Sequence, residues 1–358
     1  MAPENKQPLN LLGLVCPVPH THKETVVIGH GSGGSMTRDI IQNIFQSRLG
    51  NEYLAEDNDA ARIHLAGKDH AVAISTDSHV VSPLFFPGGD IGRLAVAGTV
   101  NDVAMLGAVP KFLTAGFVLE EGFSIESLER IIDSISETCR EAQVQIVAGD
   151  TKVVEKGKAD GLYINTTGFG LIPDGRKIGG QFAQPGDAVL ISGSIGEHAI
   201  AVLQARGELG FESGIQSDVA PLNHLVMELL DDVPIINVLR DPTRGGLATS
   251  LYEIACQSQV SIHLQEDQIP VQPNVRVACE MLGFDPLYLA NEGKVIIILP
   301  DKFADKALNT LKQSPLGTMA ARIGSISQKN PGQVLLHTAF GTTRMLRMLS
   351  GEILPRIC

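Results

Sequence analysis

Four acidic turns interrupt the apolar framework of this sequence and bring together side chains that could do chemistry. They are "STDS" with Asp77, "TVNDVAM" with Asn101 and Asp102, "AGDTKVV" with Asp150, Thr151 and Lys152, and "LRDPTRGG" with Asp241 and Arg244. A single carboxylate after a strand is often only a turn former or a helix cap. Several carboxylates together supply the hard oxygen ligands that Mg²⁺ prefers when it binds a nucleotide. We therefore expect Asp77, Asp102 and Asp150 to be magnesium ligands.

Asp102 is the carboxylate least easily explained as a turn former. It lies within "IGRLAVAGTVNDVAMLGA", a segment so rich in small apolar residues that a helix here should be buried on nearly all sides. A buried carboxylate needs a partner or a cation. Asn101, its neighbour, is a further candidate for nucleotide binding.

Glycine-rich turns supply the other half of the expected nucleotide site. "HGSGG" contains Gly33 and Gly34, "FFPGGDIG" contains Gly88 and Gly89, and "TRGG" follows Asp241; each precedes a helical pattern. Backbone N–H groups at the start of a helix favour an anion. Lys152 and Arg244 could balance phosphate charge, with Thr151 beside them. Neither the Walker pattern nor the Rossmann fingerprint occurs, so the turns predict a Mg-nucleotide site of an unorthodox type.

The sequence ends in "GEILPRIC", whose last residue is Cys358. Chance is one explanation, since the chain has five cysteines. The other is that the thiol is a carrier, because eight extended residues could move a sulfur atom on the order of 26 Å. The segment is not a prenylation box, which needs its cysteine fourth from the end.

Composition limits the class of protein. A chain of 358 residues with 44% hydrophobic residues can build two domains. Its net charge of -12 disfavours a partner among nucleic acids or anionic membranes. Apolar runs such as "KVIIILP" are far shorter than the roughly 20 residues that span a bilayer, and no signal-peptide pattern occurs. The cysteines are odd in number and lack a CxxC pair, which predicts reduced thiols in the cytoplasm.

Changes in pattern along the chain suggest four regions. Residues 1–23 read as an irregular arm; Cys16, His20 and His22 could bind a metal, but no second cluster completes a site, so a loose extension is preferred. Mixed helical and strand patterns follow over an N-terminal domain, 24–175, and a C-terminal α+β domain, 176–342, with a Gly- and Pro-rich junction at 171–187. Residues 343–358 form the tail that carries Cys358.

Several of these stretches together resemble the HypE family of hydrogenase maturation factors. They include "STDSHVVSPLFFPGGDIGRLAVAGTVNDVAMLGA", "IVAGDTKVV", "INTTGFG", "RDPTRGG", "ANEGK" and the final "PRIC". HypE is similar to aminoimidazole ribonucleotide synthetase, selenophosphate synthetase and thiamine monophosphate kinase. The resemblance implies a two-domain α+β fold of the aminoimidazole ribonucleotide synthetase type. It also implies a homodimer whose N-terminal domains pair into a β-barrel.

The same resemblance implies an ATP-dependent carbamoyl dehydratase. In the family, the terminal cysteine receives a carbamoyl group from the carbamoyltransferase HypF. The thiocarboxamide becomes a thiocyanate, and cyanide passes to iron on the HypC and HypD complex. The cofactors implied are ATP and Mg²⁺. The match begins near His30, so residues 1–23 remain without an assigned role.

Chemical reasoning agrees with this activity, because an amide oxygen leaves readily only after phosphorylation. Cys358 is then the acceptor, Lys152 and Arg244 stabilise the transferring phosphoryl group, and Glu292 in "ANEGK" is the candidate base. A salt bridge to Lys294 explains Glu292 equally well. Two other hypotheses stay open: a small-molecule synthetase or kinase of the same superfamily, and a non-catalytic scaffold or metal chaperone that presents the thiol.

Overall fold

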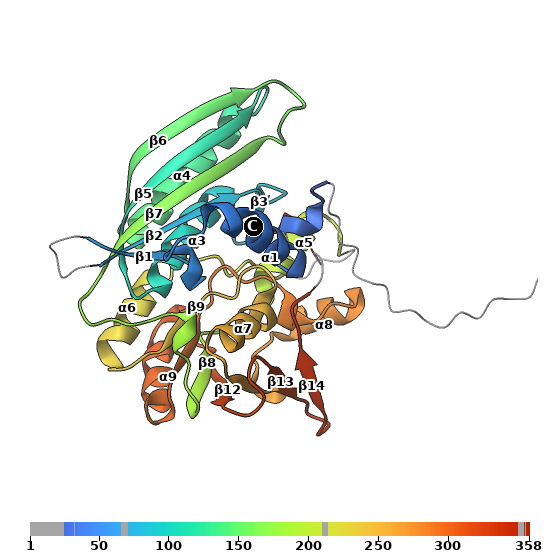
Figure 1. Cartoon of the computed structure of the whole chain (residues 1–358). Helices are drawn as coiled ribbons and strands as arrows, with labels where there is room; N and C mark the ends of the chain where they lie inside the picture. Colours follow the sequence, from blue (N-terminus) through green and yellow to red (C-terminus); the bar gives the residue numbers. More distant parts are fainter. Residues whose placement is uncertain (1–24, 32, 66–70, 210–213, 350–353, 355) are drawn as a thin grey trace, which may run out of the picture.

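In a computed structural model, the structure of the chain is described for residues 25–31, 33–65, 71–209, 214–349, 354 and 356–358. The predicted N-terminal arm, with Cys16, His20 and His22, lies outside these residues, as does Pro355. The described chain forms two α/β units, each built on a sheet of its own (Figure 1). The described part of the tail ends between the two units.

The first unit contains a five-stranded sheet with the strand order β1-β2-β7-β5-β6. Its strands are β1 (Ala61–His64), β2 (Ala71–His79), β5 (Val109–Glu120), β6 (Gln145–Val154) and β7 (Leu162–Ile172). Neighbours pair antiparallel except β5 and β6, which run parallel. A parallel pair needs a crossover, which the helix between β5 and β6 provides.

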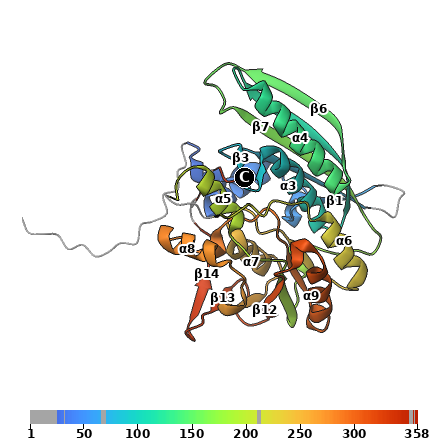
Figure 2. The same ribbon diagram turned by 180° about the vertical axis from the view of Figure 1, so that it is seen from behind.

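Two helices, α3 (Ile91–Met105) and α4 (Ile125–Ala142), cover one face of this sheet (Figure 2). Helix α4 begins after Ser124, whose hydroxyl accepts a hydrogen bond from the N–H of Ser127 at 3.2 Å. Every residue of α3 except Arg93 and Asp102 is buried, as its composition predicted. Helix α3 is buried on all sides because it lies between the sheet, α4 and the second unit.

No helix of the described residues lies on the opposite face of the first sheet. The sequence predicted an acidic turn at Asp150, but β6 runs through Asp150 to Val154 and is exposed along nearly its whole length. It is an edge strand, and apolar side chains such as Phe112, Val147 and Leu171 are exposed beside it. The presence of apolar residues in a strand does not by itself show that another part of the same chain covers them.

The second unit is a seven-stranded sheet with the strand order β14-β13-β10-β12-β8-β11-β9. Its strands are β8 (Asp187–Ile191), β9 (Val238–Arg240), β10 (Ser261–Gln265), β11 (Ile296–Pro300), β12 (Ala321–Ser327), β13 (Val334–His337) and β14 (Thr343–Leu346). Helix α7 (Gly246–Gln257) packs on one face, and α6 (Asn223–Asp232) and α9 (Ala304–Gln313) on the other. Residues 343–346, which the sequence assigned to the tail, therefore belong to this sheet as β14.

A shared apolar core joins the two units. Helices α5 (Glu197–Ala205) and α8 (Pro273–Leu282) belong to the second unit but pack into the core that contains α3. The short hairpin of β3 (Phe85–Phe86) and β4 (Gly89–Asp90) lies against α5. Burial raises the pKa of the Cys139 and Cys279 thiols to about 11. Ile357 is buried in the same core.

An N-terminal helical segment precedes β1. It consists of α1 (Ser35–Ile40), a π-helical stretch (Ile41–Gln46) and α2 (Ser47–Leu49). Short 3₁₀-helices lie at Ile28–Gly31, Leu54–Glu56, Gly180–Phe182, Glu266–Gln268, Pro286–Tyr288, Asp301–Phe303 and Pro315–Gly317. The helical pattern predicted to follow "HGSGG" is confirmed for residues 35–49. The apolar side chains of Ile41, Ile44, Phe45 and Leu49 in this segment are nevertheless exposed.

The mixed α/β fold in two units is confirmed, whereas the predicted barrel is not formed by one chain. In the described residues both sheets are open, so a barrel would require a second copy. None of the helices in the described ranges has the length and apolar character needed to cross a bilayer.

The burial of α3 makes Leu94→Ala a test of the shared core. Leu94 is fully buried, so its truncation should lower the free energy of unfolding by about 2–5 kcal/mol. Ile125→Ala is the matched control, because that side chain is 68% exposed on α4 and should change stability by less than about 0.5 kcal/mol. Urea unfolding checks both values. Equal effects would show that α3 does not hold the core together.

Candidate active site

Carboxylates from both units meet where the two units face each other. Asp77 extends from β2, Asp102 from α3, Asp241 follows β9, and Glu292 precedes β11. The charges of Asp77 and Asp241 act on both Asp102 and Glu292, and that of Asp77 also acts on Asp241. Asp59, which lies just before β1, completes the group. The turns that the sequence predicted to act together at Asp77, Asp102 and Asp241 are thus brought together by folding.

Withdrawal from water and mutual repulsion shift the protonation of these groups. Burial, followed by the charges of Asp241 and Asp77, raises the pKa of Asp102 well above its usual range. A hydrogen bond from the Ser75 hydroxyl to Asp102 Oδ2, at 2.6 Å, only partly opposes this rise. Burial and neighbouring carboxylates raise the pKa of Asp241 in the same way. The cluster therefore favours either bound protons or a bound cation.

Two arginines supply positive charge to this cluster. Arg240 Nη1 lies 2.8 Å from Asp59 Oδ1 and 3.7 Å from Glu253 Oε2, and its side chain is 9% exposed. Arg244 is more open, with 47% of its side chain exposed, and its Nη2 lies 4.0 Å from Asp77 Oδ1. The two arginines therefore differ. Arg240 is buried against its carboxylate partners, whereas Arg244 is half-exposed to solvent.

Cys358 lies within the electrostatic reach of Arg244. The negative charge at Cys358 is the largest influence that raises the pKa of the Arg244 guanidinium, ahead of those from Asp77 and Glu292. The side chain of Cys358 is half-buried, and its backbone carbonyl accepts a hydrogen bond from Val80 N at 3.2 Å. The last residue of the sequence and the acidic turns therefore share one site.

Glu292 is buried, and its Oε1 has no hydrogen-bond partner. Burial, then the charges of Asp241 and Asp77, raise its pKa well above the usual value. The expected alternative, a salt bridge with Lys294, does not form: Lys294 Nζ lies 3.0 Å from Asp218 Oδ2 instead. An unpartnered carboxyl with a raised pKa is suited to accept a proton near neutral pH.

Two side chains position the loop that carries Glu292. Asp218 accepts hydrogen bonds from Glu292 N at 3.1 Å and from Gly293 N at 3.2 Å. Asn101 donates from Nδ2 to Ala220 O at 3.1 Å and accepts from Leu222 N at 2.7 Å. The amide of Asn101 is thus engaged with backbone, and its direct contact with a nucleotide stays a prediction.

The glycine-rich turns have different surroundings. Gly33 has a φ of +77°, and an added Cβ would lie 2.9 Å from the Cβ of Arg244, so this turn approaches Arg244 as only glycine allows. Gly34 follows it and is buried. A cavity of about 1020 Å³ lies here, and its lining includes Gly33, Thr37, Arg38, Phe45 and Arg244. It is large enough for a nucleotide.

The second glycine turn does not offer an open helix end. Gly88 and Gly89 precede α3, but Asp90 Oδ1 accepts hydrogen bonds from Gly92 N at 2.7 Å and Arg93 N at 3.0 Å. The remaining N–H, that of Ile91, donates to Leu84 O. An aspartate cap therefore occupies the positions that the sequence suggested for an anion. Gly88 instead packs against Ser217 of the second unit.

Asp150, Thr151 and Lys152 lie apart from this cluster within the chain. Strand pairing places Ser78, Asn165, Gly116 and Asp150 in one row across the sheet. Three strand spacings separate Ser78 from Asp150, which amounts to about 14 Å. Asp150 is on the open face of the sheet, and Lys152 Nζ lies 2.6 Å from its Oδ2. Their predicted roles remain predictions.

The donor set fits magnesium by its chemistry. Asp77, Asp102 and Asp241 are hard oxygen donors, and their crowding would be relieved by a divalent cation. In the described ranges no three acidic, histidine or cysteine side chains already converge on one metal-binding point. Bound magnesium therefore remains a prediction.

Sequence reasoning missed Asp59, Asp218 and Arg240 as parts of the site. Arg240 directly precedes Asp241 in "LRDPTRGG", so its positive charge beside a candidate carboxylate could have indicated its role. Asp59 and Asp218 gave none, because each reaches the site through contacts between distant segments.

Comparisons with known proteins decide the family. Residues 57–172 match the family described as AIR synthase related protein, N-terminal domain, and residues 184–337 match its C-terminal domain. The carbamoyl dehydratase HypE of Cupriavidus necator is 52% identical over 92% of this chain and 94% of its own length. The chain belongs to the HypE family.

Solved structures of HypE proteins share this fold. HypE in complex with ATP matches with a TM-score of 0.78 at 51% identity, over 93% of this chain and 100% of the other. A HypE-HypF complex matches with a TM-score of 0.82 at 48% identity, over 87% and 99% of the two chains. Family membership confirms the resemblance drawn from the quoted stretches.

The raised pKa values predict how stability depends on pH when no divalent cation is present. Folded Asp102, Asp241 and Glu292 retain protons at pH values where the unfolded chain has released them. The free energy of unfolding should therefore fall as pH rises from about 4, by up to about 1.4 kcal/mol per pH unit for each retained proton.

Asp102→Asn should flatten this dependence, because it removes one such carboxyl. Urea unfolding in EDTA at about pH 6 and about pH 8 measures the change. Asp133→Asn, on the exposed side of α4, is the control. A slope in Asp102→Asn identical to that of the parent chain would show that Asp102 is not a retained proton site.

Proposed function

We propose that this chain is an ATP-dependent carbamoyl dehydratase that converts an S-carbamoyl group on Cys358 into a thiocyanate. The observation that carries the proposal is the position of Cys358 beside Arg244, at the edge of the carboxylate cluster. Relatives at 52% identity carry the name carbamoyl dehydratase, and one HypE structure contains ATP. The product would supply the cyanide ligands of the iron in [NiFe]-hydrogenases.

The reaction balances as a dehydration coupled to ATP cleavage. A thiocarboxamide, ATP and the chain give a thiocyanate, ADP and inorganic phosphate, and the amide oxygen ends in the phosphate. The nitrogen loses both of its protons, one of which ends on the inorganic phosphate while the other is released to solvent, and the C–O bond is replaced by further bonding between carbon and nitrogen. ATP supplies the phosphoryl group that turns a poor leaving oxygen into a good one.

Each residue has a role that its surroundings support. Arg244 is half-exposed beside Cys358 and would stabilise negative charge on the transferring phosphoryl group. Glu292 would take a proton from the amide nitrogen, since its Oε1 is unpartnered and its pKa is raised. Asp77 and Asp102 would hold Mg²⁺, which neutralises phosphate charge.

The open face of the first sheet supports a homodimer. Three apolar residues of this sheet are exposed: Phe112 of β5, Val147 of the edge strand β6 and Leu171 of β7. A second copy packed there would form the barrel that the resemblance implies, and would bury the surface that carries Asp150 and Lys152. These two residues would then complete a site in the neighbouring chain.

Partners follow from the same role. One solved HypE structure is a complex with HypF, which supports HypF as the carbamoyl donor. A complex of HypC and HypD would accept the cyanide. The net charge of -12 gives no support to nucleic acid as a partner.

Glu292→Gln and Asp102→Asn should leave folding intact and stop dehydration, so that the carboxamide accumulates on Cys358. Each change replaces a charge with an isosteric amide at the proposed proton acceptor or magnesium ligand. Mass spectrometry of the C-terminal peptide after carbamoylation and addition of ATP distinguishes carboxamide from thiocyanate. Complete conversion in either variant would remove that residue from the mechanism. Asp133→Asn serves as a control of normal conversion.

Light scattering at micromolar concentration should show a dimer without ligand. Phe112→Glu should shift the protein toward monomer, because it places a charge in the proposed interface, whereas Ile125→Glu on the far side of the sheet should not. A parent chain that is a clean monomer and still turns over ATP would contradict the dimer.

Mixing two inactive variants tests whether Lys152 acts across the dimer. Lys152→Ala keeps Cys358, and Cys358→Ala keeps Lys152, so mixed dimers contain one complete site if the lysine serves the neighbouring chain. Dehydration should reappear on mixing and refolding. No recovery in verified mixed dimers would place Lys152 outside the neighbour's site.

A further inference from the structure

A backbone oxygen of each of residues 356–358 accepts a hydrogen bond from the body of the chain. Arg356 O accepts from Ser82 N at 3.2 Å, and Cys358 O accepts from Val80 N at 3.2 Å. Between them, Ile357 O lies 2.7 Å from His198 Nε2. The segment therefore runs antiparallel to residues 80–82, directly after β2, and is held at each residue.

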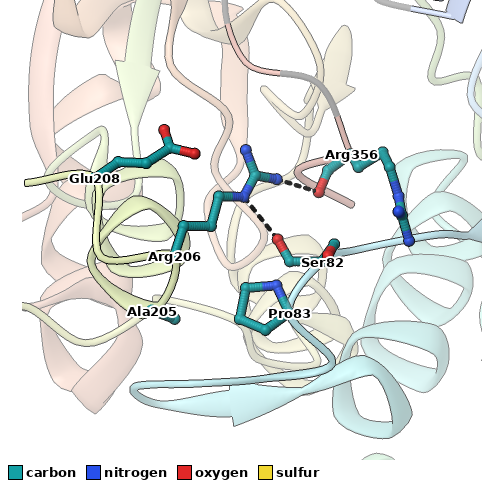
Figure 3. A pocket seen from close by; sticks show the side chains of 6 residues that line it. All are labelled: Ser82, Pro83, Ala205, Arg206, Glu208 and Arg356. Carbon is teal, nitrogen blue, oxygen red and sulfur yellow. Dashed lines mark hydrogen bonds between the residues drawn. The ribbon is translucent and has the colours of Figure 1, made fainter. Parts of the chain in front are cut away.

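Two side chains at opposite ends of α5 hold this segment. His198 lies in its first turn, and Arg206 is the residue that ends it. Arg206 Nη2 donates to Arg356 O at 2.7 Å, and its Nε donates to Ser82 O at 2.7 Å. One guanidinium thus joins the tail to the strand-like segment beside it (Figure 3).

His198 is fixed in the state that such a contact needs. Its ring is fully buried, and its Nδ1 lies 2.7 Å from Ser217 Oγ. Burial lowers its pKa, so the ring is neutral and can carry its proton on Nε2, where it donates to Ile357 O. Phe86 packs edge-on against the ring, with centroids 5.4 Å apart. The histidine is thus positioned to bind backbone and not to titrate.

The same contacts hold Cys358 beside Arg244, because the residue next to it is anchored. Ile357 is 5% exposed in the shared core, and its carbonyl is bound by His198. Arg206 has a more open setting: a cavity of about 380 Å³ lies beside it, lined by Ser82, Pro83, Glu208 and Arg356 among others (Figure 3). Solvent can therefore reach the Arg206 contact, whereas the His198 contact is buried.

We propose that His198 and Arg206 form a clamp on the backbone of residues 356 and 357 and set the balance between a docked and a released Cys358. In the docked state Cys358 lies within the electrostatic reach of Arg244; in the released state its thiol is open to reagents and to a carbamoyl donor. Both are positioning residues, since they contact backbone and not the thiol. The catalytic consequence rests on the proposed dehydratase function, whereas the docking claim does not.

The docking claim is tested by the rate at which iodoacetamide alkylates Cys358, followed on the C-terminal peptide by mass spectrometry. A hydrogen bond from a charged group is lost in Arg206→Ala, so alkylation should quicken by about tenfold or more. His198→Ala should act in the same direction, and Arg206→Lys should restore part of the protection. Arg322→Ala, which removes a surface arginine paired with Asp301, should leave the rate unchanged.

The functional claim is tested by two opposite changes. With the carbamoyltransferase in limiting amount, Arg206→Ala should load carbamoyl groups faster than the parent chain, whereas single-turnover dehydration of the loaded chain should slow about tenfold. A purely structural defect would slow both steps. Urea unfolding confirms that each variant is folded, and Arg206→Lys provides a milder second variant.

The outcomes separate the two claims. Unchanged alkylation in both Ala variants overturns the clamp. Faster alkylation with parallel losses in loading and dehydration overturns its role in the reaction. If the parent chain never carries a carbamoyl group on Cys358, the proposed function fails, but the alkylation rates still decide whether the clamp exists.

Discussion

Crowding of carboxylates between the two units is the constraint on which the site depends. Asp77, Asp102, Asp241 and Glu292 are drawn from segments far apart in the chain, and burial together with neighbouring carboxylates raises the pKa of Asp102, Asp241 and Glu292. Such a cluster would weaken the fold unless positive charge offset it. Buried Arg240 supplies such positive charge through its ion pairs with Asp59 and Glu253. Arg244 remains half-exposed and is available for an anion, which explains why Cys358 is found beside it.

The shared core makes this crowding possible. Because α3 lies between the first sheet and the second unit, Asp102 can accept a hydrogen bond from Ser75 of β2 and still feel the charge of Asp241 from the second unit. Asn101 of α3 and Asp218 of the second unit hold the backbone of Glu292, since Asn101 Nδ2 donates to Glu292 O and Asp218 Oδ1 accepts from Glu292 N. Ile357 of the tail packs into the same core. The apolar contacts that join the two units therefore also hold the residue next to Cys358.

Local signals in the sequence were sufficient for the helices and for much of the site. Small apolar residues predicted the burial of α3. "KVIIILP" contains β11, a strand buried on both faces, whose apolar run matches this position. Asp77, Asp102, Arg244, Glu292 and Cys358 meet because the chain folds as the family resemblance implied.

Other features depend on contacts that a single sequence does not display. Strand β6 is exposed because no helix in the described ranges covers that face, and its apolar residues Ile146, Val147 and Val153 give no sign of this in the sequence. The turn at Gly88 looked open to an anion, but Asp90 caps the helix that follows. Asp59 and Asp218 act through partners more than 70 positions away, and His198 likewise reaches Ile357 across 159 positions.

The central claim is that the carboxamide on Cys358 loses its oxygen to phosphate. Cyanate labelled with a heavy oxygen isotope can carbamoylate the thiol directly, so the test needs no partner protein. After removal of excess reagent and addition of ATP and Mg²⁺, mass spectrometry of the inorganic phosphate follows the label. Our account predicts that the heavy oxygen appears in phosphate, one atom for each thiocyanate formed on Cys358. Thiocyanate formed with unlabelled phosphate, or ATP cleavage that leaves the carboxamide intact, would contradict it.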